Sequence, residues 1–314
     1  MSKAITEPAA GAVSYADGAA WVDGRIVPVA DAKISILDTG FSRSDVTYDV
    51  VGVWRGAFFR LDAHLERFER SCRELRLDPG LARAEIADIL FELVRRSGLR
   101  DAYVEVLCTR GVSRRGVRDP RTFENRFFAY AIPFVWLLRP EDPEAGMDAV
   151  IARTVRRIPS SSVDPTVKNF HWGDLTRGLY EAYDRGGHYP VLLDEDGNVT
   201  EGAGYNVFAV TAGRLITPSR GTLQGVTQRT VLELARREGI PTELTTVSEE
   251  TFRAADELFA TTTAGGVMPI TSLDGRPVGD GRVGPLTRRL RELYWAAHED
   301  PAYASPVDYE DVPA

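Results

Sequence analysis

The chain has 314 residues, 43% of them hydrophobic, and it carries a formal net charge of −8 with an isoelectric point near 5.2. This length and hydrophobic content predict two domains, each with a substantial core. The acidic balance argues against nucleic acid or an anionic membrane surface as the main partner, and the lack of any run of about eighteen apolar residues argues against a transmembrane helix.

Residues 1–17 are expected to form a loose arm, because proline and acidic residues stand where a secretory signal needs an apolar core. The two cysteines, Cys72 and Cys108, fall in a predicted helix and a predicted strand, without the paired spacing of a zinc site. We therefore expect buried, reduced thiols in a cytoplasmic protein. The four histidines are scattered along the chain, so we expect no metal centre.

Residues 1–137 are predicted to form a small α+β domain. Its expected strands are residues 19–30, turning at Asp23-Gly24, residues 46–61, turning at Arg55-Gly56, residues 102–109, and a run that begins at Arg126. Apolar side chains at helical spacing predict two helices, at residues 62–77 and 82–97. An arginine-rich loop separates the last two strands.

Residues 138–147 are polar and proline-rich, and we interpret them as a linker to a larger domain at residues 148–314. The strands expected there are residues 149–158, 189–202, 206–218 and 255–263, the second and third of these being strand–turn–strand units. The expected helices are residues 169–187, 228–239 and 285–300. The fold class is therefore α/β (α+β), with a β-rich second domain wrapped by helices.

Lys168, in DPTVKNFHWGDL, is one of only three lysines among 38 basic residues. Arginine stays protonated at ordinary pH, whereas lysine can lose its proton and act as a nucleophilic amine. Because the chain otherwise uses arginine for positive charge, a lysine at this position indicates a need for a free amine. The ordinary alternative is a surface lysine at the start of a helix.

Three further features follow Lys168 along the chain. Glu201, in VTEGAGYN, ends a hairpin strand, and LQGVTQRT at residues 223–230 places Gly225, Val226 and Thr227 in the first turn of a helix, where free N–H groups suit a phosphate. ATTTAGG ends a strand with three threonines and two glycines. The alternatives are a solvated carboxylate, a common threonine cap and an edge strand with a glycine turn.

Together and in this order, these stretches resemble the branched-chain and D-amino-acid aminotransferases, the fold type IV enzymes that use pyridoxal 5′-phosphate. The resemblance runs from about residue 18 to 300, and its main segments are FFRLDAHLERF, DPTVKNFHWGDL, VTEGAGYNVF, LQGVTQRTV and ADELFATTTAGGVMPITSLDG. SDVTYDVVGVW, TVRRIPSSSVDPTVKNFHWGDL and TTTAGGVMPI look particularly like the (R)-selective amine transaminases.

The resemblance implies roles for individual residues. Lys168 would hold the cofactor as a Schiff base and later move a proton, and Glu201 would keep the pyridine nitrogen protonated. The other implied cofactor-binding residues are Arg60, whose fork suits the phosphate, Leu223 against the ring, and Val226, Thr227, Thr262 and Thr263.

The resemblance also implies a substrate pocket lined by Tyr48, Trp172 and Ala264. Arg115 matches a mobile arginine that engages the carboxylate of a keto acid, with Arg114 and Arg118 as alternatives in register. Arg43 stands where amine-specific relatives have a histidine or an aromatic residue, and there it could bind the carboxylate of a D-amino acid.

The function implied is a transaminase that moves an amino group from an (R)-amine or a D-amino acid to a keto acid such as pyruvate, in ping-pong half-reactions. The resemblance further implies a homodimer with the active site near the interface. The alternatives are a D-amino-acid or L-branched-chain aminotransferase and an enzyme like aminodeoxychorismate lyase, which eliminates pyruvate. A non-catalytic vitamer-binding protein would need no lysine in register with Glu201.

Overall fold

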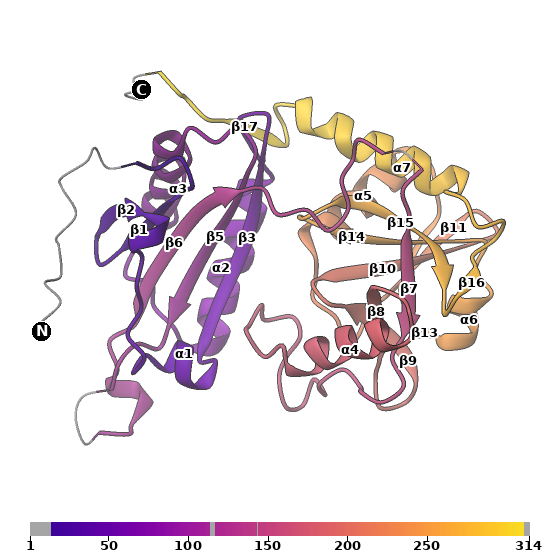
Figure 1. Cartoon of the computed structure of the whole chain (residues 1–314), viewed down its shortest axis with the longest axis horizontal. Coiled ribbons are helices and arrows are strands. Elements are labelled where there is room, and N and C mark those ends of the chain that lie inside the picture. The colour runs from indigo at the N-terminus through magenta and orange to yellow at the C-terminus, as the bar shows by residue number, and fades with distance from the viewer. Residues whose placement is uncertain (1–13, 114–116, 143, 311–314) are drawn as a thin grey trace, which may run out of the picture.

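The computed structural model describes residues 14–113, 117–142 and 144–310, and Figure 1 shows two lobes side by side, each built on a β-sheet. The helices are α1 (Thr39–Arg43), α2 (Leu61–Leu75), α3 (Arg83–Ser97), α4 (Gly173–Asp184), α5 (Val226–Arg237), α6 (Glu249–Arg253) and α7 (Pro285–Ala296), with 3₁₀ turns η1 (Val29–Asp31), η2 (Pro120–Thr122) and η3 (Ala297–Glu299). Most of residues 1–17, the predicted loose arm, lie outside the described residues.

The first sheet is antiparallel and has the order β17-β4-β3-β5-β6-β1-β2. Its strands are β1 (Ala19–Val22), β2 (Arg25–Pro28), β3 (Val46–Trp54), β4 (Ala57–Phe59), β5 (Ala102–Thr109), β6 (Arg126–Pro133) and β17 (Ala304–Pro306). The two predicted hairpin turns are confirmed, since Asp23-Gly24 and Arg55-Gly56 all have positive φ, as a tight two-residue turn requires. Helices α2 and α3 pack on this sheet.

The domain boundary predicted at residue 148 would place β4 and β17 in different domains, but these two strands pair in the first sheet. Strand β17 belongs by sequence to the second domain but pairs with β4 of the first sheet. Figure 1 shows the chain crossing back to the first lobe after α7.

The buried thiols are where the sequence analysis placed them: Cys72 on α2 and Cys108 on β5 are both buried and free. No helix in the described part of the chain has the length and apolar character to span a bilayer.

The second sheet runs in the order β12-β11-β10-β14-β15-β7-β8-β9-β13, with β16 beside β15. Its strands are β7 (Met147–Ile151), β8 (Tyr189–Leu193), β9 (Asn198–Gly202), β10 (Tyr205–Thr211), β11 (Arg214–Pro218), β12 (Thr242–Thr245), β13 (Val247–Ser248), β14 (Glu257–Thr262), β15 (Gly266–Leu273) and β16 (Arg276–Pro277). A further pairing of β9 with β10 closes the middle of this sheet into a ring. Helices α5 and α7 pack together beside it.

Strands β7 and β8 are parallel, so the chain must cross from the end of one to the start of the other. Residues 152–188 make this crossing, and α4 is its helix. Two predictions were wrong here: the strand expected at 149–158 ends at Ile151, and the helix expected from residue 169 begins at Gly173. Lys168 therefore lies in an irregular stretch before the helix rather than inside it.

His298 is half-buried where the second lobe meets β4 of the first. Its ring stacks on Phe59 with centroids 3.7 Å apart and on Trp295 at 4.8 Å, while Nδ1 lies 3.0 Å from the carbonyl oxygen of Tyr294. Burial lowers the pKa of His298 to about 4, and its hydrogen bond to Tyr294 only partly opposes this. The ring is therefore neutral in the folded protein at pH 7.

We expect the free energy of unfolding to fall by up to about 3 kcal/mol as the pH is lowered from 6.5 to 4. The folded-state pKa of His298 lies below its unfolded value, so the unfolded chain binds the extra proton in that window and gains stability. Urea unfolding across this range tests the prediction, with His298→Phe as the non-titrating control. An equally steep loss in that variant would contradict it.

Candidate active site

The backbone of Lys168 is fixed against the first lobe at both of its polar groups. Its carbonyl oxygen accepts hydrogen bonds from Thr47 Oγ1 at 2.7 Å and from the Tyr48 N–H at 3.3 Å, both on β3. Its own N–H donates to Ser71 Oγ on α2 at 3.3 Å. The crossing segment of the second lobe thus places Lys168 at the junction of the two lobes.

The amine of Lys168 has no competing polar partner. Its Nζ lies 4.3 Å from the centroid of the Tyr48 ring and makes no hydrogen bond or ion pair with any residue that the structure describes. The aromatic face stabilises the protonated amine without capturing it in a hydrogen bond. The nitrogen can therefore react with a group that enters beside Tyr48.

Glu201 lies near the end of β9, and its side chain is buried. Its Oε2 accepts hydrogen bonds from Thr222 Oγ1 at 3.0 Å and from the Leu223 N–H at 2.8 Å. Its Oε1 accepts one from Arg157 Nε at 3.0 Å. Both carboxyl oxygens of Glu201 are therefore held in place by hydrogen bonds.

Arg157 is the cation that makes this burial possible, and the sequence analysis did not assign it. Its guanidinium is buried between two carboxylates, with Nη1 only 2.6 Å from Asp174 Oδ2 in the first turn of α4. Burial alone would lower the pKa of Arg157, but the charges of Glu201 and Asp174 outweigh it, and the pKa is raised. Arg157 thus lies between Asp174 and Glu201 and forms an ion pair with each of them.

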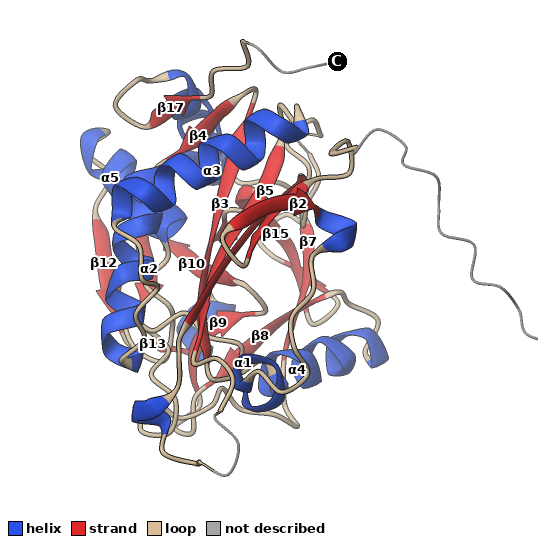
Figure 2. Cartoon of the chain, turned by 90° about the vertical axis from the view of Figure 1, so that its left-hand side faces the viewer, coloured by secondary structure: helices blue, strands red, loops and turns tan. Residues whose placement is uncertain are grey.

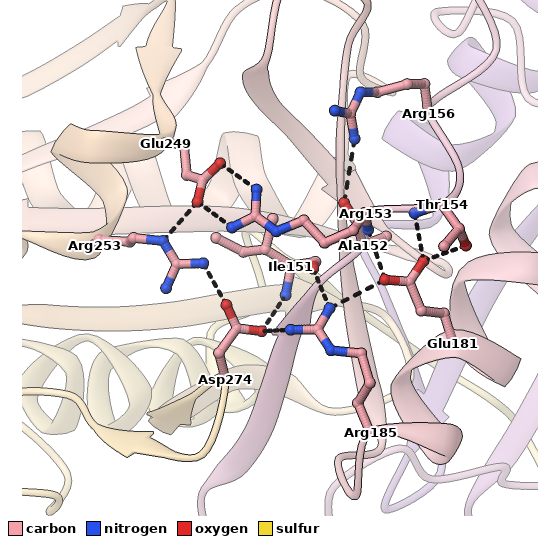
Figure 3. Close-up of polar contacts among 10 residues, drawn as sticks. All are labelled: Ile151, Ala152, Arg153, Thr154, Arg156, Glu181, Arg185, Glu249, Arg253 and Asp274. Carbon is pink, nitrogen blue, oxygen red and sulfur yellow. Dashed lines mark hydrogen bonds and ion pairs between the residues drawn. The ribbon is translucent and has the colours of Figure 1, made fainter.

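A polar network holds the residues just before Arg157, as Figure 3 shows. Glu181 on α4 accepts hydrogen bonds from the Arg153 N–H at 2.6 Å and from both the N–H and the Oγ1 of Thr154, at 2.8 and 2.6 Å. Burial raises the pKa of Glu181, yet these hydrogen bonds outweigh it and lower the pKa to about 2. The outer ring consists of Arg185, Asp274, Arg253 and Glu249. These contacts therefore fix the position of the segment that leads from β7 to Arg157.

The loop before α5 is locked by Asn206. The Nδ2 of Asn206 donates to Thr222 Oγ1 and to the Leu223 carbonyl oxygen, both at 2.8 Å. Gly225 approaches so closely that a Cβ there would lie 2.0 Å from Asn206 Oδ1, which only glycine avoids. Helix α5 then begins at Val226 without a side-chain cap, so its first N–H groups are free for an anion, as predicted.

The opposite wall comes from the end of β14 and the start of α4. Thr262 Oγ1 donates to the carbonyl oxygen of Gly204 at 2.9 Å, and Gly204, at φ +87°, is covered by the ring of Trp172. Thr261 Oγ1 is buried with no hydrogen-bond partner in the described part of the chain. This wall combines an aromatic surface with a free hydroxyl.

One cavity brings together most of the residues predicted from the sequence. Its lining includes Lys168, Tyr48, Trp172, Glu201, Leu223, Val226, Thr227, Thr262 and Thr263. A smaller hollow continues past the start of α5 and shares Val226, Thr227 and Thr263 with this cavity.

Arg60 lies beside α5 rather than in the lining of either hollow. Its Nη2 is 3.2 Å from Glu233 Oε2, and its guanidinium lies 4.9 Å from the ring centroid of Tyr303. Its Nε is buried and has no partner among the described residues. A side chain with one free buried donor can still take an anion, so its predicted phosphate contact stays a prediction.

The other predicted substrate residues lie elsewhere. Arg43, at the end of α1, is exposed and lines a neighbouring hollow, which shares Val167, Asn169 and His171 with the cavity of Lys168. Within one chain, Arg43 itself is not in the described lining of that cavity. The sequence could not show this, because the direction of a side chain on a short helix depends on the fold. Ala264 is in the turn after β14, and its carbonyl oxygen accepts from the Leu137 N–H, but it does not line the cavity.

The arginine loop is only partly described. Arg115 and its alternative Arg114 lie outside the described residues, and Arg118 is exposed. The role of Arg115 therefore stays a prediction.

A second cavity of about 740 Å³ adjoins the first and shares Tyr48 and Trp172 with it. Its wall carries Glu105, which the sequence analysis missed. Glu105 Oε2 accepts hydrogen bonds from the hydroxyls of Tyr130 at 2.7 Å and Tyr103 at 3.3 Å, and burial raises the pKa of this carboxyl. An acid in an apolar wall disfavours an anionic substrate group there.

Comparison with known proteins places this geometry among transaminases. The family model described as "Amino-transferase class IV" matches residues 47–273. A putative branched-chain-amino-acid aminotransferase of Methanocaldococcus jannaschii is 33% identical over 87% of this chain and 94% of its own length. A D-alanine aminotransferase of Staphylococcus haemolyticus is 29% identical over 87% and 95%. The chain spans about half the length of two 30% identical branched-chain-amino-acid aminotransferase-like proteins of Arabidopsis thaliana.

Solved structures agree with these relatives. A branched-chain amino acid aminotransferase from the thermophilic archaeon Thermoproteus uzoniensis, solved with norvaline, superposes with a TM-score of 0.84 and 30% identity over 93% of this chain and 99% of its own. The Escherichia coli enzyme gives a TM-score of 0.87 with 25% identity over 94% and 100%. A further branched-chain enzyme, in complex with N-(5′-phosphopyridoxyl)-L-glutamate, has a TM-score of 0.85 at 28% identity over 93% and 99%.

Proposed function

The chain belongs to the class IV aminotransferases, enzymes that use pyridoxal 5′-phosphate, and from this premise we propose that it moves an amino group from an (R)-amine or a D-amino acid to a keto acid such as pyruvate. The observation that supports this choice of donor is that the arginines in the described lining of the cavity already have ion-pair partners. Both arginines in its described lining, Arg67 and Arg157, are already bound to buried carboxylates.

The residues of the cavity fit the cofactor. The free N–H groups at Val226 and Thr227 suit its phosphate, and two buried polar atoms without a partner in the described part of the chain, Thr261 Oγ1 and Arg60 Nε, offer further hydrogen bonds. Tyr294 lies near both groups. Burial raises its pKa to about 12, against the opposing effects of a hydrogen bond with Thr227 and of the charge of Arg60.

Each chemical role then falls to a residue whose surroundings suit it. Pyridoxal 5′-phosphate supplies an aldehyde that condenses with amines and a ring that accepts the electron pair left when the substrate loses a proton. Lys168 would hold the cofactor through Nζ and would move a proton with the same nitrogen. Glu201, held in place by Arg157, would keep a proton on the ring nitrogen. Leu223 would pack against the ring.

The donor preference follows from the two paired arginines. Arg67 binds Asp49 with two hydrogen bonds, from Nε at 2.7 Å and Nη2 at 2.8 Å, and burial of Asp49 is outweighed by this guanidinium, which lowers the carboxyl pKa. With Arg67 and Arg157 both paired, the described lining has no guanidinium left for a substrate carboxylate. An amine without a carboxylate needs none, because Tyr48 and Trp172 can bind its apolar groups.

For the keto acid we propose Arg115 as the residue that binds the carboxylate, as the resemblance implies. The product of a keto acid is an amino acid with the same carboxylate, so the same arginine would serve a D-amino acid used as donor.

We propose that the active form is a homodimer. Ile34, Ile36, Leu37 and Phe41 expose large apolar side chains, Ile36 to 75%, and Ile34 and Phe41 line the second cavity. A second copy of the chain would cover this patch and complete the cavity wall. A monomeric mass by light scattering would contradict this pairing.

We expect (R)-1-phenylethylamine and D-alanine to donate to pyruvate with kcat/KM at least about tenfold above L-leucine, a margin of roughly 1.4 kcal/mol in the transition state. A coupled assay with each donor, and with pyruvate and 2-oxoglutarate as acceptors, measures this. Preference for L-leucine with 2-oxoglutarate would instead identify an L-branched-chain enzyme. Pyruvate release without an acceptor would identify a lyase.

Two variants serve as matched controls for this screen. Arg43→Ala is expected to keep the donor preference, because Arg43 lies outside the cavity of its own chain. Arg115→Ala is expected to slow the half-reaction with pyruvate and leave the half-reaction with (R)-1-phenylethylamine unchanged. If Arg114→Ala or Arg118→Ala gives that split instead, the assignment within the loop is wrong.

A further inference from the structure

A third cavity, of about 270 Å³, lies behind the wall that carries Leu223 and Val226. Helix α2 forms one side with Arg67 and Arg70, and α5 forms the other with Arg229 and Arg236. Figure 2 shows α2, α5 and β12 along one edge of the molecule. The cavity is therefore built by both lobes, and it shares the wall of Arg67, Leu223, Gly225 and Val226 with the cavity of Lys168.

The described lining of this cavity carries more positive charge than its acidic residues can neutralise. Arg67 is bound to Asp49, and among the described residues Arg236 donates only to the neutral Thr242 Oγ1, from Nε at 3.1 Å. The remaining carboxylate in the lining is Glu66, which lies 3.8 Å from Arg229, with both side chains more than half exposed. A pair so exposed is strongly screened by solvent.

Arg70 is the clearest sign of a missing anion. It makes no hydrogen bond or ion pair with any described residue, and its Nη2 is buried with no partner. Its charge also acts on Arg229, whose pKa is lowered by burial and by the neighbouring guanidinium groups of Arg60, Arg67 and Arg70. Buried donors of this kind are normally satisfied, and crowded cations favour a bound anion.

We propose that this cavity is a binding site for a small multivalent oxyanion, a phosphate ester or a di- or tricarboxylate, held by Arg70, Arg229 and Arg236. Guanidinium groups bind the oxygens of such anions with paired hydrogen bonds. The volume of about 270 Å³ holds several atoms beyond one water, whose share of liquid volume is about 30 Å³. A monocarboxylate leaves most of the charge unmatched.

The site lies back to back with the one that holds Glu201. Thr222 and Leu223, which donate to Glu201, also line the oxyanion cavity, and Arg67 Nη1 donates to the Gln224 carbonyl oxygen at 3.2 Å. A ligand here would therefore contact the other surface of the segment that fixes the carboxylate.

Isothermal titration of the holoenzyme tests the proposal, because the cofactor then fills its own phosphate site. Citrate, glycerol phosphate and inorganic phosphate are titrated at constant ionic strength, with acetate as the monovalent comparison. We expect saturable binding of one citrate or phosphate ester per chain and none of acetate. The anion that binds most tightly identifies the class of ligand.

The variants Arg70→Gln and Arg229→Gln are each expected to weaken this binding at least tenfold. Arg73→Gln, at an exposed position on the same helix outside the cavity, is the matched control and is expected to bind as the wild type does. Arg70→Lys keeps the charge and gives a readout if the glutamine variant does not fold. No saturable binding by the wild type, or equal affinity in the Arg70 and Arg73 variants, would overturn the proposal.

Discussion

Replacing Lys168 by alanine is expected to lower transamination by at least about a thousandfold, because in the proposed mechanism the same nitrogen binds the cofactor and moves the proton. The Nζ of Lys168 has no hydrogen bond or ion pair within the described chain, so its loss leaves no buried polar group unpaired. The variant is therefore expected to fold, and loss of activity will report chemistry rather than instability. Steady-state rates with the best donor from the screen measure the effect.

The substitution Lys168→Arg is the informative comparison at this position. It keeps a positive charge beside Tyr48 but removes the amine that can lose its proton. We expect it to be as inactive as the alanine variant. Borohydride reduction and mass spectrometry of the wild type should then locate the cofactor adduct on Lys168. An adduct on another side chain, or an arginine variant with substantial activity, would refute the role assigned here.

Replacing Arg157 by leucine is expected to destabilise the protein by about 3–5 kcal/mol, the usual penalty for removing one partner of a buried ion pair. The change leaves Glu201 and Asp174 buried without their shared cation. Urea unfolding of the cofactor-free protein measures it. Arg156→Leu is the matched control, because Arg156 is exposed and, within the described part of the chain, donates only to the Ala152 carbonyl oxygen, at 3.3 Å.

The Arg157 variant also carries a test of mechanism. Without the guanidinium, Oε1 of Glu201 loses the hydrogen bond from Arg157 Nε, so the carboxyl group is no longer fixed at both oxygens. Activity that remains is expected to need a higher concentration of pyridoxal 5′-phosphate for half-saturation than the wild type does. A loss in stability with an unchanged cofactor requirement would make Arg157 a structural residue only.

Local patterns in the sequence predicted the elements whose signals are local. The glycine turns at residues 24 and 56, the apolar stripe of α2 and the start of α5 at Val226 all depend on residues a few positions apart. The cavity could be predicted because several of its residues fall in motifs with a recognisable family resemblance.

Interactions between distant residues could not be predicted in this way. Arg157 and Glu201 are 44 positions apart, and no periodicity links a buried arginine to the acid that it will meet. Glu105 belongs to an ordinary strand, and only the packed sheet brings the hydroxyls of Tyr103 and Tyr130 to it. The strand β17 was missed for the same reason, since its partner β4 lies far back in the chain.

The parallel pairing of β7 with β8 has a consequence for when the enzyme becomes reactive. Parallel strands need a crossover connection, and this connection contains Lys168. The backbone of Lys168 forms hydrogen bonds there with Thr47 and Ser71 of the other lobe. If Lys168 holds the cofactor as proposed, its backbone is fixed for that role only when both lobes are in place. We then expect a chain whose lobes have not yet packed together to lack selective reaction with the aldehyde.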